Sequence, residues 1–388
     1  MDFSLDENQL AFQHAARNFA AGDMAPFAAQ WDEEKIFPKN TLKKAGELGF
    51  MGMYCPEDVG GMNLSRLDTS IILEELAMGC TSTAAYISIH NMASWMIANW
   101  GKEAVKRQWC SDLIAGKKLA SYCLTEPSAG SDAGALRTKA KKQGDHYILN
   151  GSKVFISGAG ATDVLVVMAR TGSQQSGAKG ISAFAVPANL EGVSYGKNEA
   201  KMGWNSQPTR AISFDNVKLP VECLLGAEGQ GFKIAMMGLD GGRINIASCS
   251  MGAAQACLNH AQQHMKQREQ FGQPLAAFQA LQFELAEMVT QLVAARQMIR
   301  LAASKIDNNH PDKTTYCAMA KRFATDVGFN VCNQALQLHG GYGYIKEYPI
   351  ERFMRDARVH QILEGSNEIM QVIISRRMLE DDAIDSIR

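Results

Sequence analysis

The sequence has almost no net charge, because 39 lysine and arginine residues are balanced by 40 aspartate and glutamate residues. It also has no long basic run, so the electrostatic signature of a nucleic-acid-binding protein is missing. No apolar run approaches the roughly 18 residues that a membrane-spanning helix requires. These absences predict a protein that neither binds nucleic acid nor spans a membrane.

Paired cysteines are absent as well. The nine cysteines are scattered and form no Cys-x-x-Cys motif, which argues against a zinc site and against a disulfide framework. The N-terminal stretch MDFSLDENQL is acidic and has neither an apolar signal region nor an Arg-rich transit segment. We therefore expect a soluble protein of a reducing compartment, the bacterial cytoplasm, with a processed chain of the mitochondrial matrix as the alternative.

Nucleotide-binding and metal-binding signatures are also missing. No Gly-x-Gly-x-x-Gly follows a strand in a βαβ unit, so nicotinamide binding on a Rossmann domain is unsupported, and the P-loop pattern is absent. His260 and His264 are four residues apart but lack the glutamate of a zinc-protease motif, so we interpret them as surface residues. No bound metal is expected.

The composition is that of a folded globular protein, with 46% hydrophobic and 20% charged residues. A chain of 388 residues exceeds the usual size of a single core, so two or three subdomains are expected. The residue patterns divide the chain into residues 1–120, 121–227 and 228–388, which read as helical, β and helical in turn.

The first region shows apolar residues at helical intervals. Ser4 and Glu7 stand at capping-box spacing before the first predicted helix. The stretches LDTSIILEELAMG and EAVKRQWCSDLIAG predict further helices, and the second ends at Gly116.

The middle region predicts strands. HYILNGSKVFISG indicates two short strands joined by a hairpin turn at Asn150 and Gly151. DVLVVMAR, GISAFAVP and TRAISFDNVKL predict further strands with no helix between them. Such a succession favours an antiparallel sheet or small barrel.

The last region predicts three long helices with short connections, typical of an antiparallel bundle. The third ends at Gly340 and Gly341. The stretch LEGSNEIM (363–370) then interrupts the helical pattern and places Glu364 on a Gly-Ser loop. An arbitrary glutamate is usually an exposed carboxylate, but catalytic groups are often carried on loops of rigid scaffolds, and both interpretations stay open.

Three other segments have one structural and one functional interpretation. CLTEPSAGSD (123–132) is either a domain linker or a loop whose hydroxyls and N–H groups hold a polar ring edge or a phosphate. Arg268 is either a solvated helix-end charge or a pyrophosphate ligand. Asp240 and Arg243 share a helix face and can form a surface ion pair. The interior glycines between them each cost about 1 kcal/mol of helix propensity, which suggests that something approaches the backbone closely.

Four motifs occur together in a recognisable order: YCLTEPSAGSD (122–132), QREQFGQPLAAFQ (267–279), QALQLHGGYGY (334–344) and RVHQILEGSNEIM (358–370). Through them the sequence resembles the acyl-CoA dehydrogenase family over essentially its whole length. The resemblance implies a mainly α fold with a central β domain. It comprises an N-terminal α-helical domain (1–120), an antiparallel β-barrel-like middle domain (121–227) and a C-terminal four-helix bundle domain (228–388). It also implies a homotetramer with one FAD per subunit.

Matching of motif positions implies the ligand-binding residues. The flavin and its ribityl chain would meet the 122–131 loop and the strand that follows, and the pyrophosphate and adenosine would meet the segments after residue 267. The 337–341 segment would act from a neighbouring subunit. The implied FAD ligands are Tyr122, Cys123, Leu124, Thr125, Gly130, Ser131, Phe155, Ile156, Ser157, Arg268, Gln270, Phe271, Phe278, Gln279, Gln337, Leu338, His339, Gly340, Gly341, Ser366, Asn367 and Glu368. The implied acyl-CoA ligands are Ser131, Asp240, Gly241, Gly242, Arg243 and Arg376.

The resemblance makes Glu364 the catalytic base. It would take the α-proton of an acyl-CoA thioester while the β-hydrogen leaves as hydride to flavin N5, and electron-transfer flavoprotein would accept the electrons. The Glu364 N–H would help to stabilise the enolate-like oxygen, and burial under substrate would raise the pKa of the base.

Substrate choice is implied by smaller segments. GWNSQPTRA (203–211) and GGRINIASCS (241–250) resemble the branch of the family that converts isobutyryl-CoA to methacrylyl-CoA in valine catabolism. Many other members carry Tyr before the base and Trp at the Phe155 position, whereas Leu363 and Phe155 agree with this branch. The alternatives are 2-methylbutyryl-CoA or another short-chain acyl-CoA, an oxygen-using acyl-CoA oxidase, or a helical interaction protein without the chemistry. Glu364, Arg268 and TEPSAGSD argue against the last.

Overall fold

The computed structural model describes residues 4–387. Residues 1–3 and Arg388, which the predicted domain ranges include, lie outside the described residues. The helical region begins with α1 (Glu7–Phe19), α2 (Ala28–Glu33) and α3 (Lys39–Glu47), and continues with α4 (Arg66–Gly79), α5 (Thr81–Trp100) and α6 (Glu103–Ile114). The α1 capping box is formed by Asp6 and Gln9 rather than by Ser4 and Glu7. Two overlapping capping patterns are present, and only the second stands directly before the helix.

Helix α5 is the longest helix of this region that sequence patterning did not identify, and the short helices α2 and α3 were missed as well. Helix α5 is buried at 16 of its 20 residues and crosses the interior, so it has no polar face to mark it as amphipathic. Its neighbour α6 ends as predicted, because Gly116 adopts φ 64° just beyond the helix.

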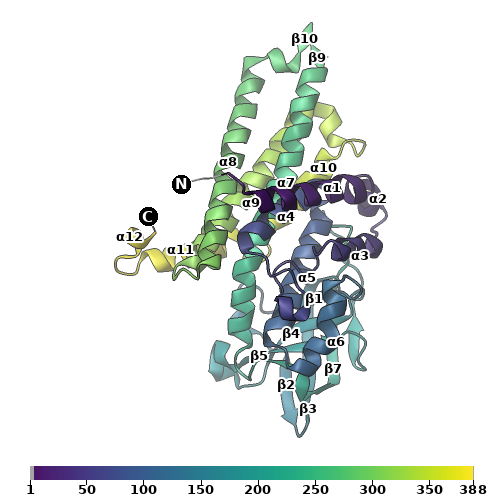
Figure 1. The fold of residues 1–388 in the computed structure, drawn as a ribbon, viewed down its shortest axis with the longest axis vertical. Coiled ribbons are helices and arrows are strands. Elements are labelled where there is room, and N and C mark those ends of the chain that lie inside the picture. The colour runs from purple at the N-terminus through teal and green to yellow at the C-terminus, as the bar shows by residue number, and fades with distance from the viewer. Residues whose placement is uncertain (1–3, 388) are drawn as a thin grey trace.

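The middle region is one sheet at one end of the molecule (Figure 1). Its strands are β1 (Ala120–Cys123), β2 (Lys139–Gln143), β3 (His146–Ser157), β4 (Val164–Arg170), β5 (Ile181–Pro187), β6 (Val193–Tyr195), β7 (Thr209–Pro220) and β8 (Leu224–Leu225). The order is β6-β7-β3-β2-β4-β5-β8, with β1 beside β4. Most pairs are antiparallel as predicted, but β1 and β4 run parallel, as does the single pairing of β2 with β4.

The predicted hairpin at Asn150 and Gly151 is wrong. These residues lie inside the continuous strand β3, at a register shift against β7, and the turn is at Gly144 and Asp145 between β2 and β3. The Asn150 side chain accepts a hydrogen bond from the Asn216 N–H on β7. A glycine is needed beside it because a Cβ at position 151 would lie 2.6 Å from Thr138 Oγ1. The Asn-Gly pair therefore marks a β-bulge.

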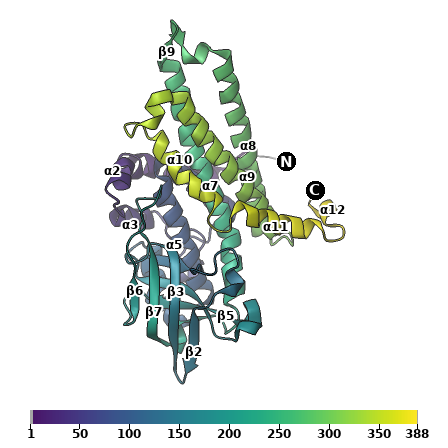
Figure 2. The ribbon, with the colours of Figure 1, turned by 180° about the vertical axis from the view of Figure 1, so that it is seen from behind.

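The third region is built on α7 (Gly231–Gln267), α8 (Gln279–Asp307) and α9 (Lys313–His339), as predicted. Figures 1 and 2 show α7 running from the sheet to the opposite end, where β9 (Glu269–Gln270) and β10 (Gln273–Pro274) form a small hairpin, while α8 and α9 lie beside the far part of α7. Then follow α10 (Ile350–Arg358), α11 (Asn367–Met378) and α12 (Ala383–Ser386), the last two projecting from the bundle (Figure 2). No helix within residues 4–387 is long and apolar enough to cross a membrane.

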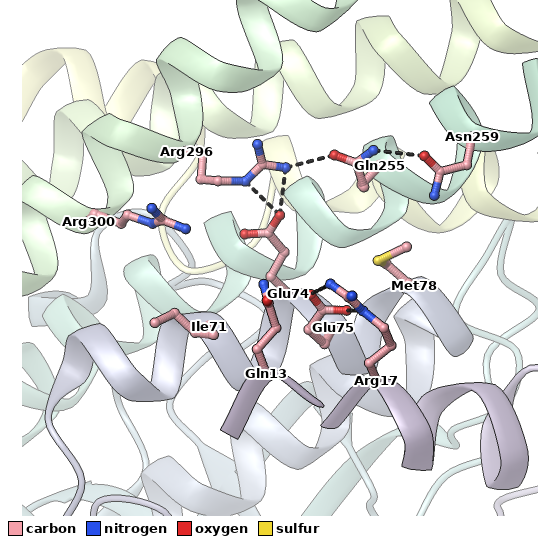
Figure 3. A pocket seen from close by; sticks show the side chains of 10 residues that line it. All are labelled: Gln13, Arg17, Ile71, Glu74, Glu75, Met78, Gln255, Asn259, Arg296 and Arg300. Carbon is pink, nitrogen blue, oxygen red and sulfur yellow. Dashed lines mark hydrogen bonds and ion pairs between the residues drawn. The ribbon is translucent and has the colours of Figure 1, made fainter. Parts of the chain in front are cut away.

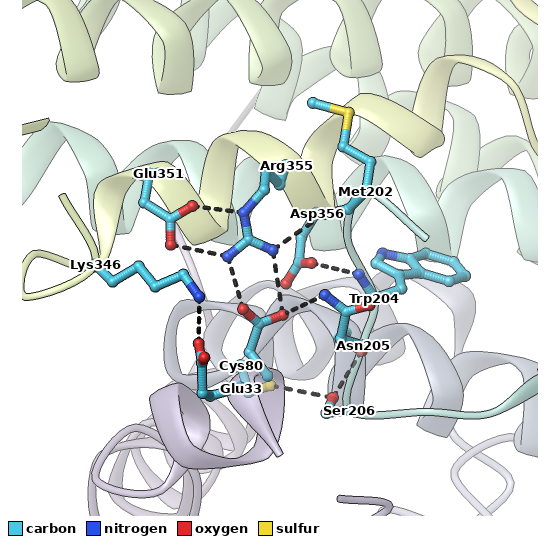
Figure 4. Close-up of polar contacts among 12 residues, drawn as sticks. Glu33, Cys80, Met202, Trp204, Asn205, Ser206, Lys346, Glu351, Arg355 and Asp356 are labelled. Carbon is cyan, nitrogen blue, oxygen red and sulfur yellow. Dashed lines mark hydrogen bonds and ion pairs between the residues drawn. The ribbon is translucent and has the colours of Figure 1, made fainter. Parts of the chain in front are cut away.

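A polar junction ties the three regions together (Figure 4). The Arg355 guanidinium on α10 pairs with Asp32 on α2 at 2.7 Å and donates to the Met202 carbonyl at 3.1 Å. Asp356 accepts a hydrogen bond from the Trp204 N–H at 2.6 Å. The loop before β7 is thus fixed against both helical regions.

Candidate active site

Glu364 lies where the sequence predicts a break between helices. A short 3-10 turn (Val359–Gln361) ends before it, and α11 begins after it. Glu364 has φ 54° and Gly365 has φ 88°, and the left-handed region is strained for a glutamate. Such strain persists only where the surroundings impose it, and it often occurs at functional sites.

The carboxylate of Glu364 is in an unusual environment. The residue is half-buried, and its Oε2 atom is out of contact with solvent and has no hydrogen-bond partner in residues 4–387. Burial raises the pKa of this carboxyl to about 7, although the charges of Lys321 and Arg243 act to lower it. The interpretation as an ordinary exposed carboxylate is therefore wrong.

The two glycines of α7 explain how the carboxylate reaches its place. A Cβ at Gly242 would lie 2.3 Å from Glu364 Oε2, and a Cβ at Gly241 would lie 2.6 Å from Arg66 Nη1. The close approach that the sequence predicts thus includes two charged side chains of the protein itself. Gly242 is required because any larger residue would displace Glu364.

The Asp240–Arg243 pair is present at 2.8 Å, but it is not a surface pair. The Arg243 side chain is 6% exposed and that of Asp240 is 13% exposed. Arg243 Nε also lies 3.4 Å from the Glu364 carbonyl oxygen, and the second Asp240 oxygen accepts from the Thr314 hydroxyl at 2.6 Å. The pair therefore supports the loop that carries Glu364.

Lys321 on α9 was not predicted. Its side chain is fully buried, and its ammonium donates to the Gly365 carbonyl at 2.9 Å and to Asn367 Oδ1 at 2.8 Å. The Asn367 amide donates in turn to Asp326 at 2.7 Å, so this predicted cofactor residue uses its side chain inside the protein. A lysine in the apolar stripe of Cys317 and Ala324 was the available sequence signal.

The 122–132 loop is held in a defined shape rather than acting as a linker. The fully buried Lys153 on β3 donates to the Leu124 carbonyl at 2.9 Å and to Glu126 at 2.8 Å. Glu126 also accepts from the N–H groups of Arg137 and Thr138. Gly130 and Ser131 are exposed at its tip, where they can meet a ligand.

Two aromatic residues border this loop. Tyr122 Oη is buried without a partner in the described chain, and burial, with a smaller contribution from the Glu364 charge, raises the pKa of this phenol. Phe155 has φ 58° and an exposed ring, between Lys153 and the strand residues Ile156 and Ser157. An exposed aromatic ring on a rigid strand can pack against a planar group.

Other predicted ligands lie far from Glu364 within one chain. Arg268 follows the C-terminal end of α7, roughly 40 Å from Gly242 at 1.5 Å per residue. The β9–β10 hairpin and the C-terminal end of α9 lie at the same end of the molecule as Arg268. The predicted FAD ligands there are exposed Gln270, Phe271, Gln279, Gln337, Gly340 and Gly341, half-buried Phe278, and buried Leu338 and His339. Arg376 is exposed on α11.

The prediction of surface histidines holds only for His260. His264 is half-buried and its ring stacks on His339 at 4.4 Å between centroids. No group of three His, Cys, Asp or Glu residues in the described chain is placed to hold a metal. All nine cysteines are buried free thiols.

A cleft of about 540 Å³ lies elsewhere, among α1, α4, α7 and α8 (Figure 3). Arg296 crosses it to bond Glu74 and Gln255, and Arg17 pairs with Glu75. None of its ten lining residues is a predicted ligand-binding residue. The Glu364 loop is thus separate from this cleft.

Comparison with known proteins agrees with the resemblance of the motifs. Family models described as acyl-CoA dehydrogenase N-terminal, middle and C-terminal domains match residues 6–117, 121–217 and 229–379. The mitochondrial isobutyryl-CoA dehydrogenase of Bos taurus is 56% identical over 97% of this chain and 90% of its own length. The enzyme of that name from Dictyostelium discoideum is 55% identical over 97% of this chain and 91% of its own length.

The fold agrees as well. The solved structure of butyryl-CoA dehydrogenase from Megasphaera elsdenii superposes with a TM-score of 0.94 at 41% identity, covering 98% of this chain and 100% of that one. The predicted fold class, helical regions on either side of a β region, is confirmed.

Proposed function

The chain belongs to the acyl-CoA dehydrogenase family, and from this premise we propose that it dehydrogenates isobutyryl-CoA to methacrylyl-CoA, a reaction of valine catabolism. The family makes it an oxidoreductase that acts on CH–CH bonds with a flavin acceptor. The similarity to two isobutyryl-CoA dehydrogenases supports the branched substrate. One observation carries the proposal: Glu364 presents a buried carboxylate oxygen without a partner, with its pKa raised to about 7.

The residues near Glu364 fit FAD. The 122–131 loop offers hydroxyl and N–H groups at a fixed position, and Phe155 offers an exposed ring for a planar partner. Arg268, which lies roughly 40 Å along α7 from Gly242 and so far from Glu364 in the same chain, matches a pyrophosphate by its charge and geometry. When bound, FAD supplies the acceptor for the hydride that leaves the β-carbon, and electron-transfer flavoprotein is the expected next acceptor.

The protein contributes the base and the oxyanion stabilisation. The Glu364 carboxylate takes the α-proton, because a carboxyl with a pKa of about 7 is about half ionised at neutral pH and is more basic than an ordinary carboxylate. The Glu364 backbone N–H donates to no residue in 4–387, so it is free to bind the thioester oxygen as negative charge develops there. One strained loop thus supplies both groups.

The charge of Lys321 predicts a pH effect. The groups facing Glu364 are Arg243 and Cys249 on α7, Lys321 on α9 and Tyr122 on β1. Because Lys321 lowers the pKa of Glu364, Lys321→Met will raise that pKa and move the rise of kcat/KM with pH to higher pH. The exposed Lys117→Met is the control and should leave the profile unchanged. An unmoved profile in Lys321→Met would show that its charge does not act on the base.

The proposal is tested by anaerobic titration of the purified protein with isobutyryl-CoA while the flavin absorbance band is followed. Bleaching at stoichiometric substrate supports it. A yellow protein that stays oxidised rejects this substrate, and bleaching by 2-methylbutyryl-CoA would then identify the alternative. Rapid peroxide release during aerobic turnover would indicate an oxidase. A colourless protein that takes up no FAD would contradict the enzyme proposal altogether.

We also propose a homotetramer, in which a second copy brings Arg268 and the 337–341 segment to the FAD of the first. The roughly 40 Å between Arg268 and Gly242 supports shared sites. The surface of helix α8 supports association of copies as well. In one chain it exposes the apolar side chains of Phe283, Val289, Val293 and Leu301, and such exposed apolar surface marks protein–protein interfaces. The nine free thiols suit either expected compartment, the bacterial cytoplasm or the mitochondrial matrix.

Charge on α8 should therefore separate the subunits. Val289→Glu combined with Val293→Glu is expected to lower the mass measured by light scattering and to release FAD, because a buried carboxylate without a partner is costly. Leu48→Glu, at another exposed apolar residue, should do neither. An unchanged mass in the double variant would place the interface elsewhere.

A further inference from the structure

Arg66, the first residue of α4, is a buried cation. The neighbouring Asp307 carboxylate accepts a hydrogen bond from the Arg66 backbone N–H at 2.8 Å and not from its guanidinium. The Arg66 side chain is largely buried, its Nη1 atom has no hydrogen-bond partner, and it forms no ion pair within residues 4–387. The guanidinium lies 3.5 Å from the centroid of the Tyr54 ring and 5.3 Å from that of Trp95. Arginine remains charged in proteins, so a buried arginine N–H without a hydrogen-bond acceptor lowers the stability of the folded protein considerably.

This guanidinium stands next to the catalytic loop. It contacts the Gly241 position on α7, and Glu364 contacts the Gly242 position, one residue on. Because consecutive Cα atoms are about 3.8 Å apart, the Arg66 guanidinium and the Glu364 carboxylate lie within roughly 12 Å of each other. With van der Waals contacts of about 3.5–4 Å at each end, that distance leaves room for only a few carbon atoms beyond the carbon from which the base takes the proton.

Asn245 extends the same polar surface. It follows Gly241 by one helical turn, and its amide donates to the Tyr54 hydroxyl at 3.2 Å. Its Oδ1 atom is buried and lacks a hydrogen-bond partner among residues 4–387. Arg66 and Asn245 both contact Tyr54, and they hold one unused donor and one unused acceptor.

We propose that Arg66 forms the end wall of the acyl site and restricts the enzyme to short acyl chains; this inference rests on the proposed function. A chain longer than that of isobutyryl-CoA would bring methylene groups against the guanidinium. Hydrocarbon cannot satisfy the unpaired N–H, and it would remove what remains of the charge's solvation. Arg66 therefore acts as a specificity-determining residue through its charge, and the glycine at position 241 gives it room.

Binding measurements separate this inference from the proposed reaction. In a Glu364→Gln background, which prevents turnover, calorimetry gives the dissociation constants of isobutyryl-CoA and hexanoyl-CoA. We compare Arg66→Met, which removes the charge at similar length, with Arg66→Lys, which keeps it. Arg66→Met should shift the hexanoyl-to-isobutyryl affinity ratio toward hexanoyl-CoA at least about tenfold, the low end of what one methylene contributes in an apolar pocket. Arg66→Lys should keep the parent ratio.

Three outcomes would overturn the inference. Equal ratios in the parent, Arg66→Met and Arg66→Lys would show that Arg66 does not face the acyl chain. Equal shifts in Arg66→Met and Arg66→Lys would show that shape and not charge sets the limit. Tighter binding of glutaryl-CoA than of isobutyryl-CoA, lost in Arg66→Met, would make Arg66 an anchor for a carboxylate. If Arg66→Met does not fold, Arg66→Gln, also neutral, makes the same comparison, with circular dichroism reporting the fold.

The two proposals fail in distinguishable ways. If wild-type protein binds but does not oxidise isobutyryl-CoA, the proposed reaction fails and the affinity ratios still test Arg66. If isobutyryl-CoA is oxidised and the ratios do not move, only the role of Arg66 is rejected.

Discussion

Glu364→Gln is expected to leave the flavin oxidised when isobutyryl-CoA is added, with the rate of its reduction lowered by about 10⁴-fold, the upper end of the contribution of a positioned general base. Glutamine matches glutamate in size and keeps the backbone N–H, but it cannot accept the α-proton. Because Glu364 Oε2 has no partner in the described chain, the substitution breaks no internal hydrogen bond. The loss should therefore fall on the reaction and not on the fold. Stopped-flow absorbance of the flavin band measures the rate.

Two controls separate the chemistry from binding and folding. Glu347→Gln, at an exposed glutamate in the loop before α10, should reduce its flavin at the wild-type rate. Glu364→Gln should retain FAD, melt near the wild-type temperature and still bind isobutyryl-CoA. Flavin reduction within tenfold of wild type in this variant would show that another group takes the proton.

The elements that repeat a simple pattern were predictable from the sequence. The strands β4 and β5 are short apolar runs, β7 alternates in part, and the helices α7, α8 and α9 repeat apolar residues at helical intervals; the structure has all six where these patterns predict them. The loop at Glu364 was predictable too, because Gly and Ser interrupt a helical pattern there. Sequence patterns that are compatible with only one local structure therefore gave correct predictions.

Sequence patterns that fit more than one local structure, or that show no period, did not give correct predictions. Asn150 and Gly151 suit a tight turn, but they also suit a bulge, and pairing of β3 with β7 selects the bulge. Helix α5 is buried on nearly all sides, so its polar and apolar residues do not recur at a helical spacing that would reveal it in the sequence. In both cases the deciding contacts come from residues far away in the sequence.

The electrostatics of the candidate site depend on the same long-range contacts. Lys321 and Arg66 resemble other helical cations in the sequence, because burial and the absence of an ion pair are properties of the packed chain. The pKa of Glu364 follows from burial, and the carboxylate lies against α7, about 120 residues earlier in the sequence. The identity of the base could be inferred from the motif, but its environment could not.

That environment leads to the last prediction, Gly242→Ala. A Cβ at this position would lie 2.3 Å from Glu364 Oε2, so the carboxylate must move away from α7. A displacement of about 1 Å in a reacting group can cost about 10²-fold in rate, and we expect a loss of that size in flavin reduction by isobutyryl-CoA. Alanine favours a helix over glycine by up to about 1 kcal/mol, so the melting temperature should fall little, if at all.

The other glycines provide matched comparisons. Gly22→Ala adds a methyl group where nothing lies within 4 Å, and it should leave the rate unchanged. Gly241→Ala presses on Arg66 instead of Glu364, so it should alter the preference among acyl chains more than the rate with a short one. A normal rate in Gly242→Ala would mean that Glu364 works from a position clear of α7. A loss of rate in that variant with fold, FAD and substrate binding preserved would show that the helix backbone itself holds the base in place.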